Sequence, residues 1–455
     1  MDSMDNVRER CEVLEQQTEH SQPHTQALEA QTRTAGRRLR GWRLLPWRMA
    51  AVATLGLTLA LPLAIQAKTF HCGAGDVQCL IDAINEANAN GKKNTIRLET
   101  GTYALTRVDN TILGETGLPV VTSPLTITGA GADSTILERD ASALQFRLMH
   151  VAAAGSLTLR KLTLRGGVAD PHFGGGGILN LGTLTMTQTT LANNFVAGPG
   201  PGGGILNAAG AVTIDNSTLT GNSAEEGGGI FSSGPLTIRN STLVRNPSSA
   251  LGGGIFLSDS GRLTLANSAI FANSAPGAGG GLNTSGTAAI INTTFARNSA
   301  TTGGGIFNTA PGVTMITNTT IADNQSFAGG GGIANDQFST GGVVVLLNTV
   351  LARNLGQAPD CSVSVTSQGN NLIGDPTGCT ITLLPSDLTG DPGLDAFTDN
   401  DRPGNGHFPL LPTSQAIDTG NDAACPRRDQ LGQRRLNIRG VGTSICDIGA
   451  IEFSP

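Results

Sequence analysis

Charged side chains recur at one position of a repeated pattern, each directly before an asparagine. If these residues form a stripe along one face, they could hold an anionic glycan. The same stripe could instead consist of ion pairs between neighbouring repeats on a solvated face, and we favour that interpretation. The four residues are Arg245, Arg297, Asp323 and Arg353.

Three phenylalanines also share one repeat position. Exposed rings could stack on the sugar rings of a bound glycan, whereas buried rings would pack on one another along the repeats. We favour mutual packing, and we keep both sets as candidate binding residues. The three aromatic residues are Phe231, Phe256 and Phe307.

Patterns that usually carry catalysis or bind metals are missing from the sequence. No pair of acids recurs on neighbouring repeats as a glycosidase requires, and the six histidines form no HExxH motif. The acidic run from Asp395 to Asp401 lacks the spacing of a calcium loop. We therefore predict no catalytic residue, metal ligand or cofactor, while calcium remains open. A net charge of −6 also argues against nucleic acid as a partner.

A Gly-Gly-Gly-aliphatic unit recurs at steps of 24 to 27 residues, which indicates stacked structural repeats. Each unit precedes a short alternating segment with β-branched residues, such as Val212–Leu219, and this pattern predicts strands. No repeat has room for a ten-residue helix. We therefore predict an all-β fold, a right-handed parallel β-helix with two or three short strands per coil. The aliphatic residues of the units are Ile178, Ile205, Ile230, Ile255, Leu282, Ile306 and Ile333.

Two columns of asparagines, offset by six residues, support this register. Asparagine tolerates left-handed corners, and its amide can bond the coils above and below. The columns could form a ligand-binding row of amides, but we favour a structural ladder. The first column is Asn216, Asn240, Asn267, Asn292, Asn318 and Asn348, and the second is Asn222, Asn246, Asn273, Asn298, Asn324 and Asn354.

The N-terminal part predicts export. Residues 33–48 carry six arginines and no acid, and an apolar run follows from Met49 to Ile65. This order of basic, apolar and small residues is typical of a signal peptide. The run is also long enough to span a bilayer if it is left uncut. We favour cleavage, with an uncleaved membrane anchor as the alternative.

Six cysteines follow the apolar run, an even number that suits an oxidising compartment. They allow 15 pairings. We predict that cysteines close in sequence are paired. The predicted disulfides are Cys72–Cys79, Cys361–Cys379 and Cys425–Cys446.

The repeats resemble those of chlamydial polymorphic outer-membrane proteins. The Gly-Gly-Gly-Ile units look like their GGxI element, and Phe-Ala-Arg-Asn298 and Ile-Ala-Asp-Asn324 look like their FxxN element. Residues Cys79–Asn88 resemble the CSLREA box, although the Ser-Leu-Arg-Glu core is absent. The apolar residues of this segment suggest a short helix that caps the open end of the β-helix.

The C-terminal part resembles the choice-of-anchor Q domain. The three resemblances cover about residues 70–453, and they imply an exported surface protein. The residues that match the choice-of-anchor Q domain are Asp391-Pro392, Leu410–Pro412, Ala416–Gly420, Cys425-Pro426, Asp429-Gln430, Arg434-Arg435 and Cys446–Glu452.

These observations divide the chain into five segments and predict its role. We expect an adhesive, binding or structural protein of the cell envelope or outer surface, or a secreted one. Its partner would be an extracellular glycan or a cell-surface molecule, and an uncut N-terminal segment would also hold it in a membrane. The alternative is a polysaccharide lyase or glycoside hydrolase. The segments are residues 1–48 (cytoplasmic, or the basic n-region of the signal), 49–67 (signal peptide or membrane anchor), 68–110 (N-terminal cap and first coils), 111–380 (β-helix) and 381–455 (C-terminal region with a disulfide-bearing cap).

Overall fold

A computed structural model describes residues 66–335, 342–362, 364–437 and 445–454. Residues Ala67–Pro455 form one compact unit. The predicted signal or anchor lies almost entirely outside the described residues, as does Cys11. None of the helices in the described part of the chain has the length and hydropathy that a transmembrane span requires.

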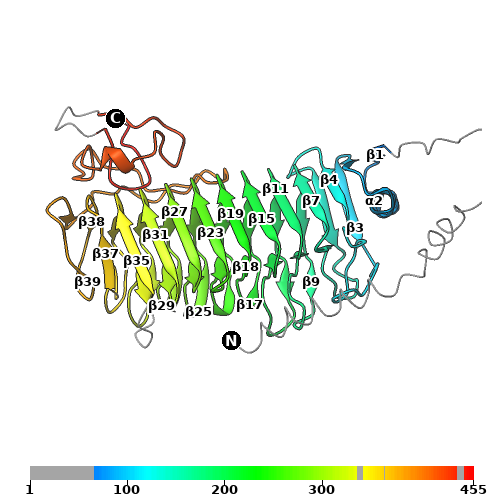
Figure 1. Ribbon diagram of the computed structural model, residues 1–455, viewed down its shortest axis with the longest axis horizontal. Coiled ribbons are helices and arrows are strands. Elements are labelled where there is room, and N and C mark those ends of the chain that lie inside the picture. The colour runs from blue at the N-terminus through cyan, green and yellow to red at the C-terminus, as the bar shows by residue number, and fades with distance from the viewer. Residues whose placement is uncertain (1–65, 336–341, 363, 438–444, 455) are drawn as a thin grey trace, which may run out of the picture. The chain divides into compact units, whose positions relative to one another are not determined.

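The unit is a parallel β-helix, as the sequence predicts, and Figure 1 shows its coils stacked in chain order. Each strand pairs in parallel with the equivalent strand of the next coil, so three long sheets run along the stack. The largest sheet has 13 strands. Its strands are β1 (Thr69–Cys72), β2 (Asn94–Leu98), β4 (Pro124–Thr128), β7 (Ser156–Arg160), β11 (Thr183–Thr187), β15 (Ala211–Asp215), β19 (Pro235–Arg239), β23 (Arg262–Ala266), β27 (Thr287–Ile291), β31 (Val313–Thr317), β35 (Val343–Leu347), β37 (Ser364–Ser367) and β39 (Thr380–Ile381).

A second sheet, with eight strands, begins at the glycine-rich units. The aliphatic residue of each unit is fully buried and points into the core. The repeat therefore sets the register of this sheet. Its strands are β6 (Met149–Val151), β10 (Ile178–Asn180), β14 (Ile205–Asn207), β18 (Ile230–Ser232), β22 (Ile255–Leu257), β26 (Leu282–Thr284), β30 (Ile306–Asn308) and β34 (Ile333–Asn335).

A third sheet has 12 strands and lies between the two asparagine columns in each central coil. Its strands are β3 (Gly101–Leu105), β5 (Thr135–Arg139), β8 (Thr163–Arg165), β12 (Thr190–Ala192), β16 (Thr218–Thr220), β20 (Thr242–Val244), β24 (Ala269–Phe271), β28 (Thr294–Ala296), β32 (Thr320–Ala322), β36 (Val350–Ala352), β38 (Leu372–Ile373) and β40 (Leu388–Thr389).

The central coils contain a fourth short strand in addition to the two or three that the sequence predicts. These segments lack regular alternation, as Ser274–Ala278 illustrates, so their pairing follows from the stacking of the coils. The strands are β9 (Val168–Ala169), β13 (Phe195–Val196), β17 (Ala224–Glu226), β21 (Ser248–Leu251), β25 (Ser274–Ala278), β29 (Ser299–Thr302) and β33 (Gln325–Ser326).

The predicted helix at the N-terminal end is present as α2 (Val77–Asn90). Asp76 caps its first turn by accepting a hydrogen bond from the backbone N–H of Cys79 at 2.9 Å. Leu80, Ile84 and Ala87 are fully buried against the first coils. The Cys72–Cys79 disulfide ties this helix to β1, so the cap and the first coil are linked covalently.

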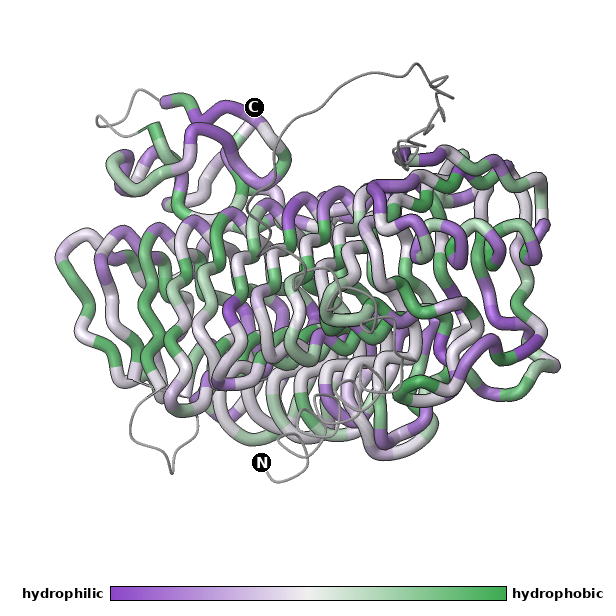
Figure 2. Tube along the Cα trace, turned by 45° about the vertical axis from the view of Figure 1, so that its right-hand side comes forward, coloured by the Kyte–Doolittle hydropathy of each residue, from purple (hydrophilic) through white to green (hydrophobic). Residues whose placement is uncertain are grey.

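Inside the coils, the core consists of small aliphatic residues stacked in rows. In the 13-stranded sheet, inward residues such as Ile214 and Ile238 are fully buried, whereas the residues between them face outward. Figure 2 shows the same alternation of hydrophobic and hydrophilic segments along successive coils. A core built from stacked aliphatic rows explains how a chain with 4% aromatic residues folds.

After β40 the chain leaves the coils and forms an irregular C-terminal region with one short 3-10 helix, η1 (Asp422–Ala424). The Cys361–Cys379 disulfide precedes this region, and Cys425–Cys446 lies within it. The region packs on the outer face of the 12-stranded sheet. The buried contact joins Val244, Ala269, Phe271, Ala296, Ala322, Val350, Ala352 and Leu372 of the sheet to Leu394, Phe408, Leu410, Ala416, Ile417 and Ile448 of the C-terminal region.

Candidate functional site

The second asparagine column forms a buried, continuous ladder of hydrogen bonds. The backbone N–H and the side-chain amide of Asn246 both donate to Oδ1 of Asn273 at 3.0 Å, and the same pair of bonds recurs from coil to coil. The spare N–H of the amide donates to a strand carbonyl, as Asn246 does to Leu219 at 3.0 Å. Because these side chains are buried and satisfied by one another, they offer little to a ligand. The members with these bonds are Asn194, Asn222, Asn246, Asn273, Asn298, Asn324 and Asn354.

The C-terminal region contacts part of the charged stripe. Arg353 forms a bidentate ion pair with Asp323, with nitrogen–oxygen distances of 2.9 and 2.7 Å. The guanidinium of Arg353 also lies 5.1 Å from the ring centre of Phe408, and that of Arg297 lies 4.9 Å from Phe397. These contacts engage Arg297, Asp323 and Arg353 within the protein. The proposed grip of the stripe on a glycan stays a prediction.

The three phenylalanines occupy equivalent positions of the eight-stranded sheet but do not form one row of rings. Phe231 is fully buried and stacks on Phe256, with ring centres 4.8 Å apart. Asn283 lies between Phe256 and Phe307 in the register. Stacking is therefore restricted to one pair, and sugar binding by these rings stays a prediction.

The first asparagine column lies at the corner between the 13-stranded and 12-stranded sheets. Its asparagines adopt positive φ angles between 45° and 51°, the left-handed conformation that a tight corner requires. In the two coils before Asn216, the same corner is formed by Lys161 and Gln188, with φ of 53° and 52°. One polar side chain per coil therefore stands at this edge. We call this set the corner row: Lys161, Gln188, Asn216, Asn240, Asn267, Asn292, Asn318 and Asn348.

The last three members of the corner row are buried under the C-terminal region. Asn348 and Asn421 bond reciprocally: the N–H of Asn421 donates to Oδ1 of Asn348 at 2.7 Å, and Nδ2 of Asn348 donates back to the carbonyl of Asn421 at 3.1 Å. Nδ2 of Asn318 lies 3.2 Å from the sulfur of Cys446. Here the corner row fastens the disulfide-bearing part of the chain to the coils.

Asn292 contacts a buried ion pair of the C-terminal region, formed by Arg435 and Glu452. Nη2 of Arg435 donates to Oδ1 of Asn292, and Nη1 donates to Glu452, both at 3.1 Å. Burial raises the pKa of Glu452 to about 7, helped by repulsion from Asp447 and opposed by Arg435. Burial likewise lowers the pKa of Arg435. Arg435 and Glu452 thus serve to attach the C-terminal region to the coils.

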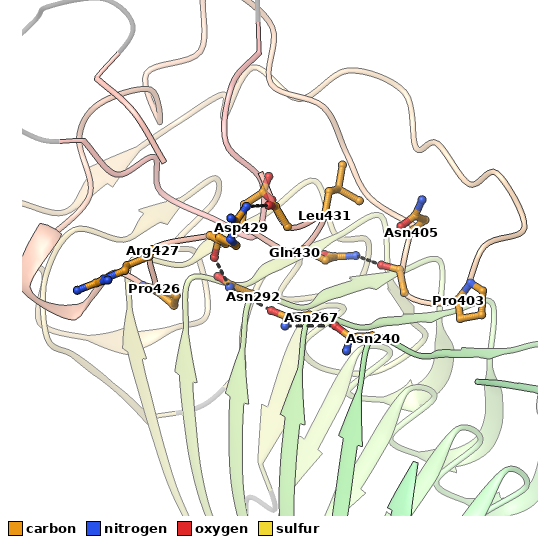
Figure 3. A pocket seen from close by; sticks show the side chains of 13 residues that line it. Asn240, Asn267, Asn292, Pro403, Asn405, Pro426, Arg427, Asp429, Gln430 and Leu431 are labelled. Carbon is orange, nitrogen blue, oxygen red and sulfur yellow. Dashed lines mark hydrogen bonds between the residues drawn. The ribbon is translucent and has the colours of Figure 1, made fainter. Parts of the chain in front are cut away.

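The earlier members of the corner row border an open groove. Two adjoining hollows that share Pro403 follow the row, with volumes of about 580 and 400 Å³. Figure 3 shows the larger one, where Asn240, Asn267 and Asn292 stand in line beneath the C-terminal region. The far wall of the larger hollow is formed by residues 403–405 and 426–432.

The wall is fixed to the 12-stranded sheet by hydroxyl groups. Thr242 Oγ1 accepts a hydrogen bond from the N–H of Gly404 at 2.8 Å, and Thr294 Oγ1 donates to Gln430 at 2.7 Å. Nε2 of Gln430 in turn donates to the carbonyl of Gly404 at 2.7 Å. Hydrogen bonds to the 12-stranded sheet thus fix the position of the wall that borders the groove.

The open part of the corner row has hydrogen-bonding capacity to spare. Gln188 and Asn216 are exposed and have no side-chain hydrogen bond within the described residues. Asn240 donates to Asp215 at 2.8 Å, and Asn267 donates to Asn240 at 3.4 Å and accepts from Asn292 at 3.2 Å. Amides offer both donors and acceptors, at intervals of about 4.8 Å along the stack. Such a row suits an extended polymer rich in hydroxyl groups.

Only part of this groove is apparent in the amino-acid sequence. Lys161 and Gln188 could have been found by extending the repeat toward the N-terminus, because each follows a strand end as Asn216 does. Within the wall, Pro426, Asp429 and Gln430 stood out in the sequence only through the resemblance of the C-terminal part, and nothing in the sequence indicated that the wall lies against the coils, because it meets them only through long-range packing. Within the described residues, no group of three or more His, Cys, Asp or Glu side chains could hold a metal ion.

Comparison with known proteins agrees with the fold. Residues 176–350 match a family model described as a right handed beta helix region. Two solved structures are similar, the A-modules of the Azotobacter vinelandii mannuronan C-5 epimerases AlgE6 and AlgE4. Their sequence identities are 14% and 15% and their TM-scores 0.39 and 0.37; each match covers 70% of this chain, and 96% and 95% of the module. At these values the likeness says nothing about what this chain binds. We found no match among curated proteins.

Proposed function

We propose that this protein is a non-catalytic scaffold that binds an extended glycan in the groove along the corner row. The observation that carries this proposal is the open half of that row. Gln188, Asn216, Asn240 and Asn267 present one amide per coil beside a braced wall. Successive sugar residues of an extended glycan could each form a hydrogen bond with one amide. Each contact would be weak, and the affinity would come from several such contacts in one complex.

An exported location belongs to the same proposal. It is supported by the basic and apolar order of residues 33–67 and by the resemblance to surface proteins in the repeats and the C-terminal region. Three disulfides suit an oxidising environment outside the cytoplasm. A scaffold of this kind would serve adhesion or contact within the envelope.

The test is binding of the full chain, purified in a mild non-ionic detergent, to an array of extended glycans. The variant Asn216→Gly/Asn240→Gly removes two groove amides, and glycine keeps the left-handed corners unstrained. Asn193→Gly is the matched control, because Asn193 is an exposed left-handed asparagine at the opposite corner.

We expect the double variant to weaken glycan binding and the control to leave it unchanged. Equal binding by all three proteins would overturn the groove as the site. The same glycans are followed for reducing ends and unsaturated products, with and without calcium. Turnover would replace this proposal with the alternative, a lyase or hydrolase.

A further inference from the structure

The charge around the groove differs from that of the chain as a whole. The sequence contains 29 basic and 35 acidic residues. At the groove, however, basic residues gather at both ends. Lys161 lines the end nearer the N-terminus, with Arg160 directly before it as the last residue of β7, and Arg427 and Arg428 line the other end. The lining of the two hollows holds three basic residues (Lys161, Arg427 and Arg428) and three acidic ones (Asp133, Asp401 and Asp429), so an anionic ligand would meet the cations through their position at the ends and not through their number.

The cations at both ends can engage a ligand. Arg160, Lys161 and Arg427 are exposed, and their side chains make no hydrogen bond or ion pair within the described residues. Nη1 of Arg428 donates to the carbonyl of Gly432 at 2.6 Å, which orients the guanidinium at the edge of the larger hollow. The other N–H groups of this guanidinium donate no hydrogen bond within the described residues, so most of its donors stay available to a ligand.

The acidic residues of the groove offset the positive charge of the basic residues to a different extent at its two ends. Asp429 is buried, and its two oxygens accept the N–H groups of Gln433 at 2.7 Å and Glu452 at 3.0 Å. By contrast, Asp133 and Asp401 line the smaller hollow together with Lys161. The end at Arg427 and Arg428 is therefore the cationic one, whereas acids offset the basic residues at the other end.

The distance between the ends sets the size of the ligand. Lys161 follows β7, and Asn292, whose amide donates to the carbonyl of Arg428 at 2.8 Å, follows β27. These strands are five coil steps apart in the sheet, a span of about 24 Å. A short sugar unit can reach one end only, whereas an extended oligomer can reach both.

We propose that the groove selects a polyanionic glycan and binds its acidic groups at the basic residues of its two ends, chiefly at Arg427 and Arg428. This inference rests on the proposed function and names its ligand class. Because the two contacts lie at a fixed spacing, affinity should depend on the length of the glycan. Once a glycan is bound at one end of the groove, its contact at the other end forms within the same complex.

The experiment measures binding of the full chain, in the same detergent, to labelled oligouronates of two to eight residues. Neutral oligomers of the same linkage and length are the reference ligands. We compare the wild type with Arg427→Gln/Arg428→Gln and Arg160→Gln/Lys161→Gln. The control is Arg262→Gln, an exposed residue at the start of β23 on the same sheet.

We expect oligouronates to bind more tightly than neutral oligomers, with a rise in affinity once the oligomer spans both ends. The Arg427/Arg428 variant should lose about fivefold in oligouronate affinity and the Arg160/Lys161 variant less, because exposed ion pairs are individually weak. Arg262→Gln should change nothing, and added salt should reduce the preference.

Equal affinity for acidic and neutral oligomers, or unchanged oligouronate binding by the Arg427/Arg428 variant, would overturn the selectivity while leaving the groove as a glycan site. If the wild type bound neither class of oligomer, the proposed function itself would fail.

Discussion

The side-chain amide of Asn354 donates to the carboxylate of Asp360 at 2.9 Å, and its backbone N–H donates to the same oxygen at 3.2 Å. The asparagine ladder thus ends on a buried acid. The second oxygen of Asp360 accepts the N–H of Asp375 at 2.6 Å. Burial nevertheless raises the pKa of Asp360 to about 6, because the three hydrogen bonds offset only part of the cost of desolvation.

Asp360 should make the last coils pH-sensitive. In the unfolded chain an aspartate titrates near 3.8, whereas in the folded protein Asp360 keeps its proton up to about pH 6. The folded state binds more protons in this window, so its free energy of unfolding falls as pH rises from about 4 to about 6. The loss is at most about 3 kcal/mol. In Asp360→Asn this pH dependence disappears.

Urea denaturation at pH 4, 5 and 7 measures the effect. The informative quantity is the slope against pH, because Asp360→Asn also replaces the acceptor that faces the N–H of Asp375. Parallel slopes for the two proteins would show that Asp360 is not the titrating group.

Removing one member of the ladder should be costly. In Asn273→Ala, Asn246 loses the acceptor of two hydrogen bonds, and the carbonyl of Leu243 loses its side-chain donor. Buried polar groups without partners cost about 1–3 kcal/mol each, so we expect a loss of about 4 kcal/mol in the free energy of unfolding. Urea or thermal denaturation measures it.

Asn240→Gly is the matched control for the ladder. Asn240 is an exposed corner asparagine, and glycine keeps its positive φ, so the expected change is within about 0.5 kcal/mol. If Asn273→Ala and Asn240→Gly lowered the free energy of unfolding by similar amounts, the second asparagine column would not be more important for stability than the exposed asparagines of the corner row.

Arg435 should hold the C-terminal region on the coils. Arg435→Gln leaves Glu452 buried without its cation, and breaking a buried pair from one side costs about 3–5 kcal/mol. We expect the C-terminal region to become sensitive to limited proteolysis while the coils resist. Cleavage sites beyond Thr389, identified by mass spectrometry, provide the readout.

Arg434→Gln serves as the control for that experiment, because the neighbouring Arg434 is exposed. If Arg435→Gln and Arg434→Gln gave the same digestion pattern as the wild type, the ion pair would not be what attaches this region.

The sequence predicts the coils well because their contacts repeat. A buried residue such as Ile230 meets Ile205 and Ile255 on neighbouring coils, so one period in the sequence defines the register. Equal spacing in sequence becomes equal spacing in space. The second asparagine column is predictable for the same reason.

The groove is less predictable because identical residues acquire different environments. Asn216 and Asn348 occupy the same corner, yet the first is open and the second is buried under Asn421. The difference arises from the C-terminal region, whose contacts join residues more than 70 positions apart. No local pattern encodes which coils it covers.

His150 should weaken the protein in acid. It is fully buried in β6, in register with Leu179, and its two ring nitrogens have no hydrogen-bond partner within the described structure. Burial, aided by the charge of Arg147, lowers the pKa of His150 to about 3. An unfolded histidine titrates near 6.5, so below that pH the unfolded state binds more protons and stability falls toward pH 3. Because of His150, the free energy of unfolding should fall by up to about 1.4 kcal/mol per pH unit below pH 6.5. This fall should be absent in His150→Leu, where the new side chain matches Leu179 on the next coil. Denaturation of both proteins at pH 7 and pH 4.5 measures this, and a variant that weakens in acid as much as the wild type would assign the acid sensitivity to other groups.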